Sequence, residues 1–141
     1  MIRIGEDKTT IYITRGDTTT GEFNKLAFCL PIYNVETKQD EYYEFKPTDK
    51  ISFVAFDKKG YTKHEILRKD YVLKDIGYVE NTKAPEIPLT EEDTKAFPLK
   101  NKSATYWYDI VLNDTLTVLG FDHEGSKKII VYPEVGERDE R

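Results

Sequence analysis

Short apolar runs in which every second residue is hydrophobic recur along this chain, and turn-forming residues separate them. The clearest run is 104–112, where Tyr106 and Tyr108 fall on one face and Trp107 and Asp109 on the other. Because successive side chains of a β-strand point to opposite faces, this alternation predicts a strand with one face in the core. Many such runs with regular turns predict an all-β sandwich of roughly seven to nine strands.

The remaining runs give the expected order of elements. Pro31 lacks a backbone N–H, so it is expected at a strand end or bulge. Asp57–Gly60, with an acid first and a glycine last, reads as a turn. The last three strands are separated by short turns, which favours an antiparallel meander. Besides 104–112, strands are expected at 9–14, 23–33, 42–45, 50–56, 63–74 (with a bulge), 86–89, 116–121 and 128–132.

One segment reads as a short helix. Thr90 precedes three acidic residues, which suit the positive end of a helix dipole, and Asp93 stands at the capping-box position. Pro98 ends the helix after about two turns, so it is a connector. We expect one domain over residues 1–141, with frayed ends at 1–8 and 134–141.

Composition limits the classes of function. The net charge of −5 gives no basic footprint for nucleic acid or anionic lipid. Cys29 is the single cysteine, so it can form no intrachain disulfide and is read as a buried small hydrophobe. The sequence shows neither a signal peptide nor a run long enough to cross a membrane. We therefore expect synthesis in a cytoplasm without export, and neither a membrane nor a nucleic acid as partner.

No residue pattern points to catalysis, a cofactor or a metal. The two histidines are His64, read as an exposed strand residue, and His123, which lies in the acidic turn Asp122–Glu124. Three consecutive turn residues rarely converge on one ion, so a solvated turn is favoured over a metal site. The glycines form no phosphate-binding loop. We expect a protein that is not an enzyme and that has no catalytic, cofactor-binding or metal-binding residues.

Two short motifs have a structural and a functional reading. Arg15-Gly16-Asp17 matches the integrin-binding tripeptide, but a strand-ending turn in which Gly16 takes a positive φ is favoured. The aromatic run 106–108 suggests a sugar platform. Alternation, however, separates Trp107 from its two tyrosine neighbours, so core packing of one face is favoured. A carbohydrate- or surface-binding β-sandwich module stays open as the alternative function.

An ordered succession of motifs resembles a small β module of phages and prophages of Gram-positive bacteria. The resemblance covers about residues 11–134, and segments 75–85 and 98–103 are longer than the usual connections. The motifs are Ile11-Tyr12-Ile13-Thr14-Arg15-Gly16-Asp17-Thr18, Tyr43-Glu44-Phe45-Lys46-Pro47-Thr48-Asp49-Lys50-Ile51-Ser52-Phe53, Ile87-Pro88-Leu89-Thr90-Glu91-Glu92-Asp93-Thr94, Tyr106-Trp107-Tyr108-Asp109-Ile110-Val111-Leu112-Asn113, Thr117-Val118-Leu119-Gly120-Phe121-Asp122 and Tyr132-Pro133-Glu134.

The resemblance implies an antiparallel immunoglobulin-like or baseplate-type β-sandwich with one short connecting helix. It also implies a non-enzymatic structural protein of the virion, in a tail, a baseplate or a head decoration. Such a protein acts through contacts with other virion proteins and is expected to form a homo-oligomer in the assembled particle. Exposed aromatics, with Trp107 a candidate, or a free strand edge would carry these contacts.

Overall fold

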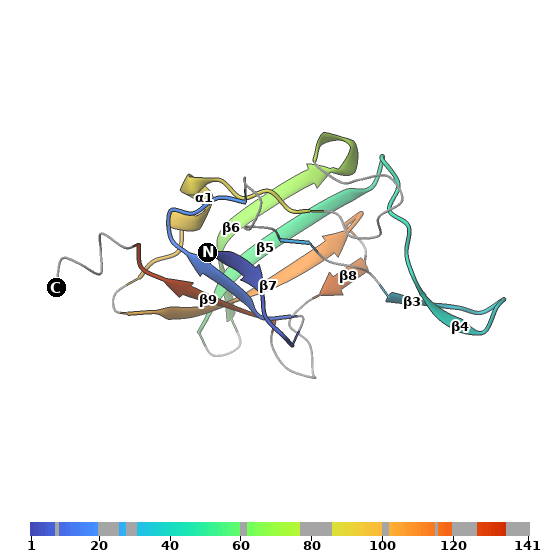
Figure 1. The fold of residues 1–141 in the computed structure, drawn as a ribbon, viewed down its shortest axis with the longest axis horizontal. Coiled ribbons are helices and arrows are strands. Elements are labelled where there is room, and N and C mark those ends of the chain that lie inside the picture. The colour runs from blue at the N-terminus through green and yellow to red at the C-terminus, as the bar shows by residue number, and fades with distance from the viewer. Residues whose placement is uncertain are drawn as a thin grey trace.

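The computed structural model describes residues 1–7, 9–19, 26–27, 31–59, 62–76, 86–99, 102–114, 116–119 and 127–134. These residues form β-strands, one short α-helix and one 3₁₀ turn, so the all-β prediction is confirmed. Figure 1 shows a sheet-based body from which one hairpin projects. The elements are β1 Ile2–Ile4, β2 Ile11–Thr14, β3 Pro31–Asn34, β4 Gln39–Tyr42, β5 Lys50–Lys59, β6 Thr62–Val72, the 3₁₀ turn η1 Leu73–Asp75, α1 Glu91–Lys95, β7 Ala104–Leu112, β8 Leu116–Leu119 and β9 Lys128–Tyr132.

The body contains a seven-stranded sheet in the order β1-β2-β9-β7-β5-β6, with β8 also paired to β7. The expectation of a wholly antiparallel fold is wrong, because β2 and β9 pair in parallel, with Ile11 opposite Ile129. The meander is also wrong. Both β8 and β9 pair with β7, β9 along Ala104–Trp107 and β8 along Ile110–Leu112. Strand β9 therefore lies between β7 and the N-terminal strand β2 in the sheet, paired with both.

One face of this sheet forms the core. Register places Ile51 beside Leu112, Phe53 beside Ile110 and Ala55 beside Tyr108, and all of these side chains are buried. The same face continues through Ile129 and Val131 of β9 into the N-terminal strands. Phe53 and Tyr108 stack with ring centroids 5.8 Å apart. Large flat side chains thus fill a pleated surface, as the aromatic content favours.

The segment around α1 covers that face. Ile87, Leu89 and Phe97 are at most 2% exposed and belong to the same core cluster. The hydroxyl groups of Tyr71 and Tyr106 donate to the carbonyl oxygens of Pro88 and Pro98. These hydrogen bonds hold an otherwise irregular segment against the sheet. They satisfy backbone carbonyl oxygens that would otherwise need water as a donor.

The capping box predicted for α1 is present. The Thr90 hydroxyl accepts from the Asp93 N–H at 3.2 Å, and the Asp93 carboxylate accepts from the Thr90 N–H at 2.9 Å. The helix itself spans only Glu91–Lys95, consistent with a connector. Asp93 also pairs with Lys69 at 3.2 Å, so the helix is attached to β6.

Several boundaries differ from the sequence prediction. Within the end expected to be frayed at 1–8, Ile2–Ile4 instead form β1, and Ile2 is fully buried. The strand expected at 42–45 lies earlier, at Gln39–Tyr42, and the one expected at 86–89 is reduced to a bridge between Glu86 and Ala27. The turn expected at Asp57–Gly60 is wrong for residues 57–59, which belong to β5, and Gly60 lies outside the described residues. The expected bulge in β6 is present opposite Ala55 and Phe56.

Other predictions fall wholly or partly outside the described residues. These are the strand at 23–33 before Pro31, apart from residues 26 and 27, the turn residues 122–125 and the C-terminal residues 135–141. Pro31 is the first residue of β3, a strand end as expected.

Candidate functional site

The Arg15-Gly16-Asp17 turn is held against α1. Gly16 has a φ of +90°, and its N–H donates to the Thr94 hydroxyl at 2.9 Å. The same hydroxyl donates to the Asp17 carbonyl at 2.8 Å. The Arg15 guanidinium donates to the Lys95 carbonyl at 3.2 Å, and the Asp17 carboxylate pairs with the Met1 amino group. All three residues thus have partners within the fold, which favours the structural reading of the motif.

The other residues weighed for chemistry are not brought together. His64 is exposed on β6, opposite Asp57 of β5. Cys29 and the turn Asp122–Glu124 with His123 lie outside the described residues. Among the residues that are described, no group of three or more His, Cys, Asp or Glu side chains could hold a metal ion.

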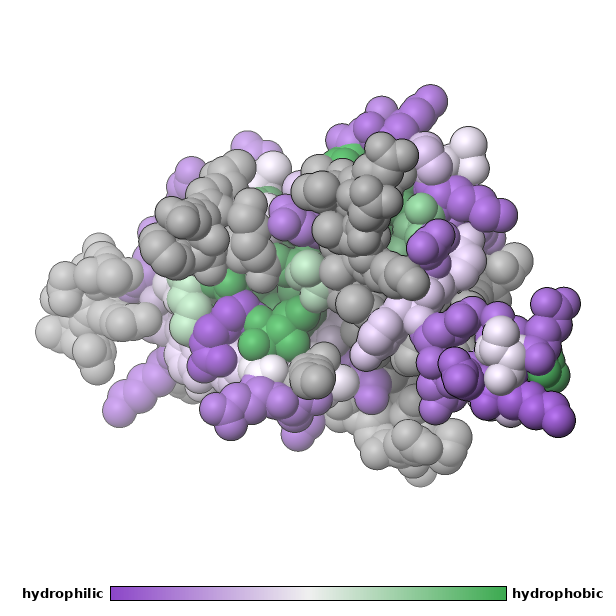
Figure 2. Space-filling view, turned by 45° about the vertical axis from the view of Figure 1, so that its right-hand side comes forward, coloured by the Kyte–Doolittle hydropathy of each residue, from purple (hydrophilic) through white to green (hydrophobic). Residues whose placement is uncertain are grey.

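The most prominent feature outside the core is the β3–β4 hairpin, residues 31–42, which we name the arm. Its strands pair only with each other, in a two-stranded sheet separate from the body. Figure 1 shows the arm projecting from the end of the body, and Figure 2 shows its mainly hydrophilic surface with a hydrophobic group near the tip. Tyr33, Val35 and Tyr42 are 60%, 78% and 54% exposed.

The tip of the arm is closed by local hydrogen bonds. The Asn34 side-chain oxygen accepts from the N–H of Glu36 at 2.9 Å, while its amide donates to Glu41 at 2.9 Å. Lys38, with a φ of +57°, donates its N–H to the Asn34 carbonyl at 2.8 Å. These contacts order the turn without help from the body, so the outward side chains are left to the solvent.

The root of the arm is fixed by Asp49. Its carboxylate accepts from the Tyr43 hydroxyl at 3.0 Å, the Lys46 N–H at 2.8 Å and the Asn113 amide at 3.1 Å. Burial raises the pKa of Asp49, but these hydrogen bonds together outweigh it and hold the pKa below its ordinary value of 3.8. Phe45, 7% exposed, packs edge-on against Tyr43 at 5.1 Å. The stretch next to the arm is therefore attached to the body.

The face of the main sheet opposite the core carries a second aromatic group. Register places Trp107 between Phe56 of β5 and Lys128 of β9, and places Tyr12 beside Ile130. Trp107, Tyr12 and Ile130 are half-buried, whereas Phe56 is buried. The predicted separation of Trp107 from the buried Tyr106 and Tyr108 is confirmed. We name Trp107, Tyr12, Ile130 and Phe56 the outer patch.

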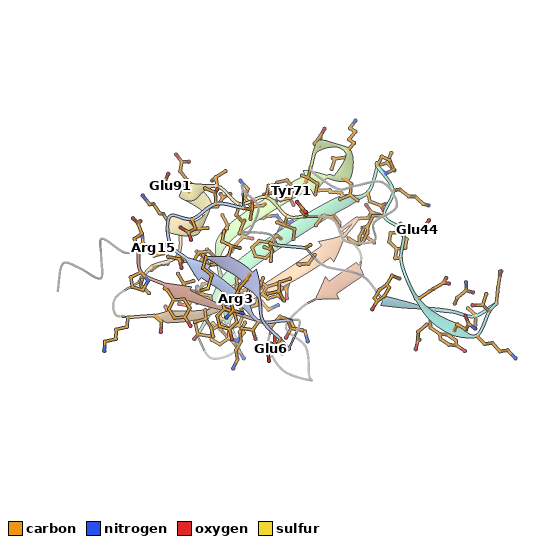
Figure 3. The ribbon with its side chains drawn as sticks, in the orientation of Figure 1. Arg3, Glu6, Arg15, Glu44, Tyr71 and Glu91 are labelled. Carbon is orange, nitrogen blue, oxygen red and sulfur yellow. The ribbon has the colours of Figure 1, made fainter. Side chains whose placement is uncertain are left out.

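Cationic side chains surround the outer patch. The Lys63 ammonium lies 4.6 Å from the centre of the Phe56 ring and pairs with Asp109 at 3.0 Å. The Arg3 guanidinium lies 4.4 Å from the centre of the Tyr12 ring. Arg3 is labelled in Figure 3 on the body of the molecule, far from Glu44 at the root of the arm. On the strands of this face, the cations are Arg3, Lys50, Lys58, Lys63, Arg68 and Lys128, and the acids are Glu65, Asp70 and Asp109.

The arm was not predicted, because the expected strands at 23–33 and 42–45 left residues 34–41 without a strand. Residues 39–41 of β4 are Gln, Asp and Glu, so the alternation that predicts a strand with one face in the core is absent there. The one available signal was Asn34, a residue that favours turns, between two stretches containing exposed tyrosines.

Comparisons with protein-family models, curated proteins and solved structures found no match to this chain. No helix within the described part of the chain is long and apolar enough to cross a membrane.

Proposed function

We propose that this chain is a non-enzymatic structural component of a phage particle and acts through protein–protein contacts. The proposal joins the ordered motifs at residues 11–134, which resemble a phage β module, to the exposed tyrosines of the arm and the half-buried aromatics of the outer patch. Protein interfaces are rich in Tyr and Trp, because these side chains bury a large area and keep a polar group for hydrogen bonding.

The observation that carries the proposal is the arm. A two-stranded ribbon alone is only marginally stable in water, and this one exposes Tyr33, Val35 and Tyr42 rather than burying them in the body. A projecting element with apolar side chains at its surface is suited to reach a neighbouring subunit. Its firm attachment through Asp49 holds it in one direction, which lowers the entropy lost on binding.

The proposal includes the finer fold type, an immunoglobulin-like or baseplate-type sandwich. Its support is the single core cluster, in which Ile2 of β1 and Phe53 of β5 both take part although three strands separate them in the sheet. A twisted sheet that brings distant strands to one core resembles two layers packed face to face.

Mass spectrometry of purified particles from the source strain tests the proposal. The chain should be present in intact virions at a stoichiometry that stays constant through repeated density-gradient purification. Absence from virions, together with abundance in infected cells, would refute the structural assignment.

A carbohydrate-binding module is the competing function, favoured by one observation. Trp107 is partly exposed on an open sheet face beside a threonine and a lysine, where an aromatic ring could stack on a sugar. Titration of glycans from the host cell wall would distinguish the two. Saturable binding measured by calorimetry, and lost in Trp107→Ala, would favour the sugar-binding function.

A further inference from the structure

The arm and the outer patch have opposite chemistry. The arm carries three acids, Glu36, Asp40 and Glu41, and one cation, Lys38. On the outer face, six cations stand against three acids, in a chain whose net charge is −5. The acidic arm is therefore complementary in charge to a local cationic face of the same protein.

The apolar groups of the two surfaces also match. Tyr33 pairs directly with Asp40, so Tyr33, Asp40 and Tyr42 lie on one face of the arm, where each is exposed. The outer patch offers Trp107, Tyr12 and Ile130, with Arg3 and Lys128 beside them. Tyrosine rings on the arm can pack against these aromatics while Asp40 meets a cation, the arrangement of anchors inside a charged rim.

The two surfaces cannot meet within one molecule. The arm projects from one end of the body, whereas β9 and the first half of β7 lie toward the other end (Figure 1). The root of the arm is fixed by Asp49, so it does not fold back. Each of the two surfaces must therefore bind another chain. A second copy of this protein offers both the matching charge and the matching aromatic side chains.

We infer that the arm of one copy docks on the outer patch of the next copy, giving a head-to-tail self-assembly. Because the two surfaces are different, the contact is heterologous, and it produces a closed ring or an open filament. The inference deepens the proposed function by naming a second copy as one partner of the chain in the particle.

A reciprocal charge reversal tests the docking. One full-length variant carries D40K on the arm, on the face that also holds Tyr33 and Tyr42, and another carries R3E and K128E beside the outer patch. Sedimentation velocity over a concentration series should show oligomers for the wild type and monomers for each variant alone. An equimolar mixture should assemble again, because each reversed surface then meets a reversed partner. This restoration also shows that both variants are folded.

Two further measurements fix the geometry. Y33S/Y42S should weaken the dissociation constant about tenfold or more, the loss typical of interface anchors, whereas E92K on α1 should leave it unchanged. A photoreactive amino acid at position 42, in a mixture of ¹⁵N-labelled and unlabelled protein, should give mixed-isotope adducts with the peptide that contains Trp107.

The inference is overturned if the wild type is monomeric at every concentration and gives no adduct from position 42. It is equally overturned if oligomers form but ignore the arm variants, or if the two charge-reversed variants stay monomeric when mixed. Virion mass spectrometry is independent of these results. Presence in particles without arm docking removes only this inference, and docking in solution without presence in particles removes only the proposed function.

Discussion

The hydroxyl of Thr94 accepts a hydrogen bond from the backbone N–H of Gly16, 78 residues earlier in the chain, at 2.9 Å. The same oxygen donates to the carbonyl of Asp17, and the Thr94 side chain is fully buried. One side chain of a five-residue helix thus fixes the turn that follows β2. The Arg-Gly-Asp turn and α1 form one structural unit, and this relationship supports two predictions.

Replacement of Thr94 by valine should destabilise the fold. Valine keeps the shape but leaves the Gly16 N–H and the Asp17 carbonyl without this partner in a partly buried site. The expected loss in the free energy of unfolding is about 1–3 kcal/mol. Chemical denaturation measures it, with Thr62→Val on the exposed face of β6 as the matched control, expected within about 0.5 kcal/mol of wild type. Equal effects at the two positions would contradict the role given to Thr94.

Replacement of Gly16 by valine should cost about 1–2 kcal/mol, because a β-branched residue is strained at a φ of +90°. A Cβ there would also lie 3.1 Å from Cδ of Glu134, whose flexible side chain must move. Gly16→Asn creates the same Cβ contact but tolerates positive φ better, so its melting temperature should fall less. A Gly16→Val protein that keeps its melting temperature and loses adhesion to cells would support the integrin-type reading instead.

Low pH should destabilise the fold through protonation of Asp49. Its pKa in the folded protein lies below the ordinary 3.8, so the stabilisation is complete above that value and is lost as the pH falls below about 4. Asp49→Asn removes this titration and, at neutral pH, should cost about 1–3 kcal/mol through weakened hydrogen bonds to Tyr43, Lys46 and Asn113. Measured from pH 6 to pH 2, the stability difference between wild type and variant should shrink. Parallel curves would show that Asp49 titrates normally.

Local patterns were sufficient where the determining contacts are local. The alternation at 104–112 predicted β7 with its bounds, and Thr90 with Asp93 predicted the start of α1. The position of β9 could not be predicted in this way. Its pairing with β7 and with Ile11–Thr14 depends on contacts between segments far apart in the chain, about which a short apolar run carries no information. The expected meander followed chain order instead.

The failures at 39–42 and 57–59 share another physical cause. Residues 39–42 make up β4 and residues 57–59 end β5. Both stretches are mainly polar, and hydrogen bonding to a neighbouring strand outweighs the loop and turn preference of their residues. Phe45, which was assigned to a strand, instead turns into the core beside Tyr43. The outer patch was foreseen only through Trp107, because the cations that surround it come from strands whose order the sequence did not reveal.

The arm should contribute to assembly and not to the stability of the monomer. Tyr33 and Tyr42 are 60% and 54% exposed, so replacing both with serine removes little buried area. The melting temperature, measured at a concentration where the wild type is monomeric, should therefore change little, within about 0.5 kcal/mol in stability. Phe53→Ala is the contrasting variant: Phe53 is fully buried against Tyr108, and its loss should cost about 3–5 kcal/mol. A large destabilisation by the two tyrosine replacements would show that the arm contributes to the stability of the monomer. It would contradict the proposal that the arm is a surface for binding a partner.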